Sequence, residues 1–267
     1  MIVTEPKPRI PDQRCPLCGE LQAVIVNGIR VEHSDPSSFS NDKMFVEKDK
    51  GYSFCNCHNI FFTDWSNMDK GEYDDFYIKR YNEPNAKIAC WKFAEKYIPI
   101  IKESFGNRSL GKFLEIGSPN DSVLDVAKVN GWHPIGLDLI KRNSNHGFLE
   151  VDFENYEFQK KYDAIWASHI FEHFKDPIGM VKKCAKILVE GGILFVVMPD
   201  PWFVDWANNP YEWIHWHIKE HHILWDLDSF CAVLEESGFE IIKKHRNTTY
   251  EFLCSGDFHI IARRNGH

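Results

Sequence analysis

Short apolar runs alternate with stretches of helical periodicity from about residue 111 to the end of the chain. The apolar runs predict seven strands, near residues 112–116, 133–137, 147–151, 164–167, 193–198, 239–245 and 252–262. Apolar residues at helical spacing predict intervening helices near 122–130, 177–189 and 227–237. This alternation is typical of an open, doubly wound α/β fold, whose ligands bind at the carboxyl ends of the strands.

The first part of the chain has a different pattern. Residues 1–70 are largely polar with short strand-like runs, which predict a small β-rich module. Apolar residues at helical spacing over 85–105 predict one long helix that contains Pro99. We therefore expect a Cys-rich module over 1–70, a helical connector over 71–110 and the α/β domain over 111–267.

Two groups of cysteines lie in the N-terminal module. Cys15 and Cys18 have the spacing of a zinc knuckle, in which two thiols on one tight turn face a single ion. Cys55, Cys57 and His58 supply further ligands, although a single residue separates the two thiols. We expect a structural zinc ion held from this set of five, because so short a segment builds little core of its own. The alternative is a decayed site or ordinary buried thiols.

Composition and charge narrow the choice of partners. Hydrophobic residues make up 43% of the chain and charged residues 26%, which is typical of a globular protein. The net charge of -8 argues against binding of long nucleic acids, which require a basic surface, and favours a small or neutral ligand. No stretch approaches the roughly 20 apolar residues of a membrane span, and the first residues lack the apolar core of a signal peptide. A cytoplasmic protein is expected.

Acidic residues follow three consecutive predicted strands. Glu115 and Gly117 end the first strand, Asp138 ends the second, and Asp152 follows the third. A carboxylate after the second strand of a nucleotide-binding unit accepts hydrogen bonds from ribose hydroxyls. Asp152 could accept from an adenine amino group, with Phe153 against the ring. The alternative for any one of these aspartates is a helix cap.

Five motifs together resemble the class I S-adenosylmethionine-dependent methyltransferases over roughly residues 85–265. They occupy residues 113–117, 136–138, 151–153, 162–173 and 188–194. The resemblance implies a Rossmann-like, seven-stranded mixed sheet with S-adenosylmethionine as cofactor. It implies that Glu115 and Gly117 border the methionine moiety, that Asp138 and its neighbour Leu139 lie at the ribose, and that Asp152 and Phe153 hold the adenine, with Ser168 nearby.

The first loop departs from the pattern of this family. A second glycine usually follows two residues after the first, whereas here Pro119 follows Gly117. Proline fixes φ and removes an amide donor, so we expect Ser118 or Asn120 to contact the cofactor instead. The departure also motivates an alternative, in which the domain binds S-adenosylmethionine without catalysing a reaction.

A group of histidines supplies candidate catalytic residues. His169, Glu172 and His173 follow the fourth strand, where they would face the methyl group. His173 is the expected general base, because an unperturbed histidine pKa of about 6.5 allows it to accept a proton at neutral pH. His221 and His222 end an insertion over residues 199–222 that is expected to cover the site, and either could be the base or hold the substrate. The alternative is that individual histidines are surface or hydrogen-bonded core groups.

A Cys-rich module before such a domain is similar to bacterial methyltransferases that act on sugars, nucleotide-linked sugars and other surface-glycan building blocks. This similarity implies O-methylation of a small hydroxylated or phosphorylated metabolite, such as a precursor in polysaccharide biosynthesis. Two other hypotheses remain. His169, Glu172, His173 and one of the two later histidines could bind a divalent ion that assists the reaction. A nicotinamide-dependent dehydrogenase is disfavoured by the missing glycine fingerprint.

Overall fold

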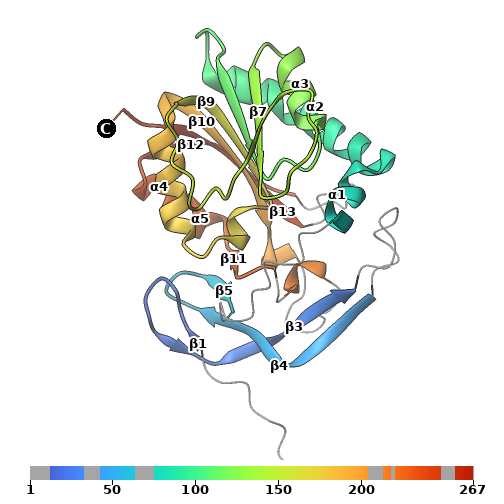
Figure 1. Cartoon of the computed structure of the whole chain (residues 1–267). Coiled ribbons are helices and arrows are strands. Elements are labelled where there is room, and N and C mark those ends of the chain that lie inside the picture. Colours follow the sequence, from blue (N-terminus) through green and yellow to red (C-terminus); the bar gives the residue numbers. More distant parts are fainter. Residues whose placement is uncertain are drawn as a thin grey trace, which may run out of the picture.

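The computed structural model describes residues 13–32, 43–63, 75–203, 213–217, 220–247 and 256–266. Figure 1 shows a larger α/β domain above a small β-rich module, with strand β11 at the junction between them. Both parts were expected from the sequence, and the Rossmann-like α/β fold with a β-rich N-terminal module is confirmed.

A mixed sheet of seven strands forms the centre of the larger domain. Its strands are β6 (Lys112–Ile116), β7 (His133–Asp138), β8 (Gly147–Glu150), β9 (Tyr162–Ser168), β10 (Leu188–Pro199), β12 (Phe239–Arg246) and β13 (Asp257–Arg264). They are arranged in the order β12-β13-β10-β9-β6-β7-β8. Strands β6 to β10 pair in parallel, whereas β13 runs antiparallel to both β10 and β12.

Strand β10 begins earlier than the apolar pattern predicts, and the helix before it ends earlier. The helix ends at Ile187 instead of near residue 189, because Leu188 already pairs with Tyr162 of β9. The pairing shifts register between Leu188 and Ile193, an irregularity that contains Gly191 and Gly192. The last predicted strand begins at Asp257, and residues 252–255 lie outside the described part of the chain.

Helices cover both faces of the large sheet (Figure 1). They are α1 (Asp75–Asn82), α2 (Pro84–Phe105), α3 (Ser122–Val129), α4 (Pro177–Ile187) and α5 (Leu227–Glu236). Val181 and Phe230, from α4 and α5, are buried in one core cluster, whereas Ile98 and Ala127, from α2 and α3, are buried in another. Pro99 lies inside α2, which continues to Phe105.

The N-terminal module contributes most of a second, smaller sheet. Strands β3 (Val24–Glu32), β4 (Lys43–Cys55) and β5 (Ile60–Phe62) pair with β11 (Ile223–Trp225) in the order β11-β5-β4-β3. Before β3 in the chain, β1 (Gln13–Arg14) and β2 (Leu21–Gln22) pair with each other as a separate two-stranded sheet. Because β11 belongs to the predicted α/β domain, the smaller sheet crosses the expected domain boundaries, which stay a prediction.

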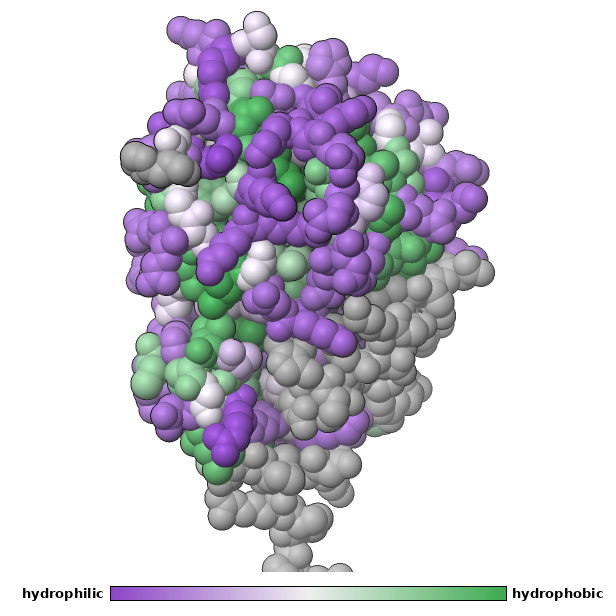
Figure 2. Space-filling model, turned by 60° about the vertical axis from the view of Figure 1, so that its left-hand side comes forward, coloured by the Kyte–Doolittle hydropathy of each residue, from purple (hydrophilic) through white to green (hydrophobic). Residues whose placement is uncertain are grey.

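Buried aromatic residues fill the junction between the two parts. The ring centroid of Trp216 lies 5.2 Å from that of Tyr52 and 5.1 Å from that of Phe61. Leu224 of β11 is buried in the same cluster. The tryptophans of the insertion therefore include core residues of this junction. Figure 2 shows hydrophilic residues predominating over the visible face of the α/β domain. Among the described helices, none has the length and apolar character that a membrane crossing requires.

Candidate active site

The candidate site lies at the edge of the large sheet where the parallel strands end. Ile116 at the end of β6 is paired with Leu137 of β7 and Ala167 of β9, and Ser168 is paired with Val197 of β10. Residues that follow these strands therefore meet at one edge. The antiparallel β13 begins at this same edge, since its first residue, Asp257, pairs with the last residue of β10.

The loop after β6 approaches its neighbours closely at Gly117. This glycine has a φ of 69°, in the left-handed region that favours glycine, and an added Cβ would lie 2.2 Å from Cδ1 of Ile170. The amides of Gly117 and Ser118 both donate to the carbonyl oxygen of Leu137, at 2.8 and 3.0 Å. The loop is thereby held tightly against β7.

An arginine fixes the part of this loop that contains Pro119. Nε and Nη2 of Arg142 donate to the carbonyl oxygen and hydroxyl of Ser118, at 2.6 and 2.8 Å, and Nη1 donates to Asp121. The Ser118 hydroxyl donates to Glu115 at 2.7 Å. The sequence prediction missed Arg142, because it follows β7 without any motif. Side-chain contacts thus stabilise a loop that lacks the usual second glycine.

Glu115 is almost completely buried beneath this loop. Burial raises the pKa of its carboxyl to about 8, although the Ser118 hydroxyl and the Arg142 guanidinium act in the opposite direction. Asp138 is also buried, and its carboxylate accepts a hydrogen bond from the amide of Ile140 at 3.1 Å. Burial raises the pKa of Asp138 as well, although hydrogen bonds from the backbone of Ile140 and Leu139 act in the opposite direction. Both predicted cofactor residues therefore lie in the same shielded region of the strand edge.

The residues predicted to hold adenine differ in exposure. Asp152 accepts hydrogen bonds from the amide of Glu154 and the side chain of Asn155, at 2.9 and 2.8 Å, so it also stabilises the local turn. Phe153 is buried and packs against Phe174, with ring centroids 5.6 Å apart. Leu139, which is predicted to lie at the ribose, is half exposed. Their contacts with a cofactor stay a prediction.

His169 lies directly after β9, between two buried carboxylates. Its Nδ1 is 3.4 Å from Glu172 and its Nε2 is 3.4 Å from Asp257. Burial lowers the pKa of this imidazole, but Asp257 and Glu172 outweigh burial and raise it to about 10. His169 also has a φ of 53°, which is uncommon for a residue with a side chain. With its pKa raised in this way, His169 is suited to orienting the two carboxylates and not to accepting a proton.

Two further histidines lie beside the same glutamate. Nδ1 of His173 contacts the carbonyl oxygen of Glu220 at 2.8 Å, and Nδ1 of His221 contacts that of His215 at 2.8 Å. The rings of His173 and His221 have centroids 4.8 Å apart. The structure therefore brings together four of the five residues that the sequence predicts as catalytic, namely His169, Glu172, His173 and His221.

His222, the fifth predicted residue, joins this group through its backbone. Its amide donates to the carbonyl oxygen of Glu172 at 2.8 Å, while its own carbonyl oxygen accepts from the amide of Thr63 at 3.0 Å. The side chain is buried, and burial lowers its pKa to about 3. The sequence prediction missed Asp257, which lies in the cluster because of the pairing of β13 with β10.

Comparisons with known proteins show the family and the fold of this chain. The model of a methyltransferase domain family matches residues 90–244, which is more than half of the chain. The chain belongs to this family. It is a class I S-adenosylmethionine-dependent methyltransferase, as the five motifs imply. No curated protein matches the methyltransferase in sequence.

Solved structures share the fold of the methyltransferase at low sequence identity. An S-adenosylmethionine-dependent methyltransferase from Clostridium acetobutylicum is 11% identical, with a TM-score of 0.51 over 66% of this chain and 92% of that one. The 1,6-didemethyltoxoflavin-N1-methyltransferase of Burkholderia thailandensis is 12% identical, with a TM-score of 0.52 over 66% and 79%. The plantazolicin methyltransferase BpumL is 14% identical, with a TM-score of 0.51 over 70% and 87%.

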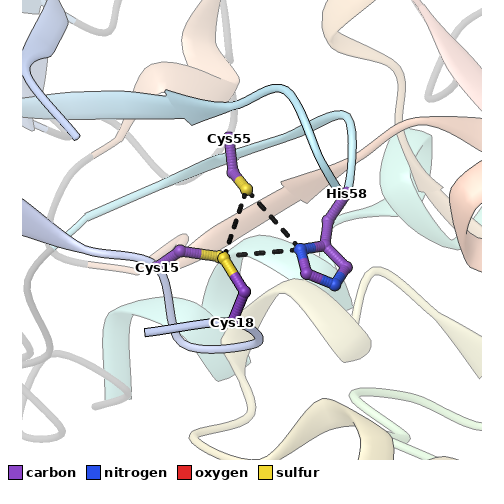
Figure 3. A group of neighbouring side chains, drawn as sticks. All are labelled: Cys15, Cys18, Cys55 and His58. Atoms are coloured by element: carbon purple, nitrogen blue, oxygen red, sulfur yellow. Dashed lines mark hydrogen bonds between the residues drawn. The ribbon is translucent and has the colours of Figure 1, made fainter. Parts of the chain in front are cut away.

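A separate group of side chains that could hold a metal ion lies in the N-terminal module of the methyltransferase. Figure 3 shows Cys15, Cys18, Cys55 and His58 pointing toward one another. The sulfurs of Cys18 and Cys55 are 3.7 Å apart, and Nδ1 of His58 lies 3.5 and 3.9 Å from the sulfurs of Cys55 and Cys15. Four ligands around a tetrahedral zinc ion, with bonds of about 2.0–2.3 Å, are separated by roughly 3.5–3.8 Å. The fifth predicted ligand, Cys57, is exposed and does not belong to this group.

Proposed function

We propose that the protein transfers the methyl group of S-adenosylmethionine to an oxygen of a small hydroxylated or phosphorylated acceptor. The observation that carries this proposal is the meeting of two groups at one sheet edge. The loop that is expected to hold the cofactor follows β6, which pairs with β9. The histidine cluster, formed by His169, Glu172, His173 and His221, begins immediately after β9. A cofactor held by the loop would direct its methyl group toward the cluster.

The cofactor is expected to lie along the ends of β6, β7 and β8. The contacts are expected from Glu115, Gly117, Ser118, Asp138, Leu139, Asp152, Phe153 and Ser168. Two of the structural neighbours were solved with S-adenosylhomocysteine, which supports the same cofactor for this chain. Arg142 is added to this set as a positioning residue, because it holds Ser118.

Methyl transfer requires a nucleophile near the sulfonium and, for a hydroxyl acceptor, removal of its proton. In a site without a metal ion, His173 is the expected base. Its Nδ1 donates to the carbonyl oxygen of Glu220, which leaves the lone pair of the neutral ring on Nε2. That nitrogen lies 3.9 Å from Glu172, which would stabilise the imidazolium formed by proton transfer.

The acceptor is expected to be a sugar or a surface-glycan precursor. The net charge of -8 disfavours long nucleic acids, and one neighbour was solved with the small molecule 1,6-didemethyltoxoflavin. Histidines and carboxylates of the cluster are suited to hydrogen bonding with hydroxyl groups. Radioactive methyl transfer from S-adenosylmethionine to a panel of sugars and sugar phosphates would identify the acceptor.

We also propose a structural zinc ion held by Cys15, Cys18, Cys55 and His58. The distances between their ligand atoms are close to those of a tetrahedral site, which supports this choice among the five residues predicted. A site with four protein ligands has no position for a substrate, so zinc would stabilise the turns that carry these residues.

Calorimetric titration with S-adenosylhomocysteine is the first test of the proposed function. Saturable binding is expected, with a nicotinamide dinucleotide as a control that does not bind. Binding of the dinucleotide alone would contradict the proposal, and absence of binding by either compound would favour a domain that has lost its cofactor.

A further inference from the structure

Three side chains of the histidine cluster offer ligand atoms to one point. One ligand atom from each of Glu172, His173 and His221 lies within 4.8 Å of the other two. Glu172 and His173 belong to a short 3-10 helix, Phe171–His173, and His221 comes from the insertion that precedes β11. The arrangement therefore depends on two segments that are distant in sequence and are joined through the backbone at His222.

Both histidines have a fixed tautomer. A carbonyl oxygen only accepts hydrogen bonds, so Nδ1 of His173 and Nδ1 of His221 must each carry the proton that contacts Glu220 and His215. The neutral rings then have their lone pairs on Nε2. Donation of the other ring N–H to a backbone carbonyl is the arrangement that orients metal-ligating histidines in proteins.

The carboxylate of Glu172 is buried and faces histidines. Its side chain is 1% exposed, and within the described residues neither oxygen forms a hydrogen bond. Its ion-pair contacts are with His169 at 3.4 Å and His173 at 3.9 Å, and no lysine or arginine of the described segments lies within ion-pair distance. Asp257 is equally buried, and within the described residues its ion-pair contact is with His169 at 3.4 Å. Two carboxylates removed from water in one cluster favour a bound cation.

We propose that Glu172, His173 and His221 bind one divalent transition-metal ion beside the methyl acceptor. Two imidazoles and one carboxylate on one side of an ion suit first-row metals such as Mn²⁺, Fe²⁺, Co²⁺ or Zn²⁺ better than Mg²⁺, and they leave positions open for a substrate oxygen. Ligand atoms around such an ion are separated by roughly 3–3.5 Å. An ion bound there would hold the three ligand atoms at about these separations.

This inference rests on the proposed function and specifies its acceptor. A bound divalent ion orients a hydroxylated acceptor and lowers the pKa of its hydroxyl group. His173 would then be a ligand instead of the base. His169 would remain a positioning residue, since it lies between Glu172 and Asp257 and fixes the carboxylate that holds the ion. An acceptor with two neighbouring oxygens, such as a vicinal diol, suits an ion with open positions.

Titration with Mn²⁺, followed by electron paramagnetic resonance, tests the site directly. Mn²⁺ prefers oxygen and nitrogen ligands, so the thiolates of the N-terminal module do not compete for it. The signal of free Mn²⁺ should fall until about one ion is bound per chain. His221→Ala and Glu172→Gln should each weaken binding by at least about tenfold, because loss of even an outer-shell partner has an effect of that size.

The control variant is His133→Ala. His133 is an exposed histidine at the start of β7, far along the strand from the carboxyl edge, and its replacement should leave Mn²⁺ binding unchanged. Circular dichroism would show that each variant is folded, and the conservative Glu172→Gln variant serves if His221→Ala fails to fold.

Two results would overturn the inference: no binding of Mn²⁺ to the wild-type protein, or equal binding by the wild-type protein and both folded cluster variants. Calorimetry with S-adenosylhomocysteine is performed separately on the same samples. Cofactor binding without Mn²⁺ binding would leave the proposed function intact, whereas the reverse would remove the methyltransferase function and retain the metal site.

Discussion

Glu115 couples the stability of the cofactor loop to pH. Its pKa rises from 4.5 to about 8 because burial disfavours the charged carboxylate, in spite of Ser118 and Arg142. Below about pH 4.5 the carboxyl is protonated in both folded and unfolded chains. Between about pH 4.5 and 8 the unfolded chain releases this proton while the folded protein retains it, so the free energy of unfolding falls as pH rises.

We therefore expect Glu115→Gln, which cannot ionise, to lose less stability than the wild-type protein between about pH 5 and 8. Urea unfolding at several pH values would measure the difference, expected to reach a few kcal/mol at the alkaline end. Parallel stability curves for the two proteins would contradict the raised pKa of Glu115.

Gly117 combines a left-handed backbone with a close contact. Gly117→Ala should destabilise the protein by about 1–3 kcal/mol from backbone strain alone, and should displace Ile170, which would lie 2.2 Å from the new methyl group. Gly238→Ala is a matched control, since Gly238 has a φ of 88° with no atom within 4 Å of the added Cβ. Thermal melting and S-adenosylhomocysteine titration should show a larger loss for Gly117→Ala. Equal effects would assign the whole cost to φ.

At the scale of single residues, the sequence predicts those residues of the site that lie within a recognisable sequence motif. His169, Glu172 and His173 lie within five residues of one another in sequence, and a single turn after β9 brings them together. Asp257 lies far along the chain and reaches the cluster through antiparallel pairing with β10, which local periodicity does not reveal. Arg142 is likewise defined by its contacts with Ser118 and not by any pattern around it.

At the scale of elements, β11 determines how the module meets the active site. It pairs with β5 immediately after His221 and His222, and the buried hydroxyl of Tyr52 donates to the carbonyl oxygen of His221 at 2.8 Å. Tyr52→Phe would leave that carbonyl oxygen without its partner, at a cost of roughly 1–3 kcal/mol.

We expect Tyr52→Phe to lower the melting temperature and the turnover number while leaving the affinity for S-adenosylhomocysteine unchanged, because the cofactor loop lies on other strands. Tyr156→Phe is the control, since Tyr156 is only half buried and its hydroxyl makes no hydrogen bond within the described segments. A loss of cofactor affinity in Tyr52→Phe would contradict a local role for this hydrogen bond.

The longer strands of the large sheet were predictable from the sequence, whereas the three-residue strand β11 was not. The apolar runs of β6, β7 and β10 are buried strands between amphipathic helices, so periodicity identifies them. Strand β11 has three residues within a histidine- and tryptophan-rich insertion, and it is a strand only because β5 is available to pair with it. Such a strand depends on tertiary structure that sequence periodicity does not contain.

At the scale of the whole molecule, the proposed zinc ligands and the histidine cluster are connected by one sheet. Cys55 ends β4, which pairs with β5, which in turn pairs with β11. Cys18→Ser should remove about one zinc ion per chain relative to the wild-type protein, whereas Cys57→Ser, at an exposed thiol outside the group, should remove none.

Metal analysis by mass spectrometry would measure both variants, and a melting experiment would show the loss of stability in Cys18→Ser. Turnover should also fall in Cys18→Ser, since strand pairing connects the module to His221. Equal zinc content in the two variants would contradict the proposed ligand set.

The shared sheet also limits how such a protein can be divided or recombined. Without the N-terminal module, β11 would lose β5, the strand with which it pairs, so its amide and carbonyl groups would be unpaired and the buried side chains of Leu224 and Trp225 would be exposed to water. Exposed apolar edges pair with other chains and aggregate. A chain shortened to begin at α1 should therefore precipitate or associate even though the family domain is intact, and evolution could exchange the module only together with the insertion that completes its sheet.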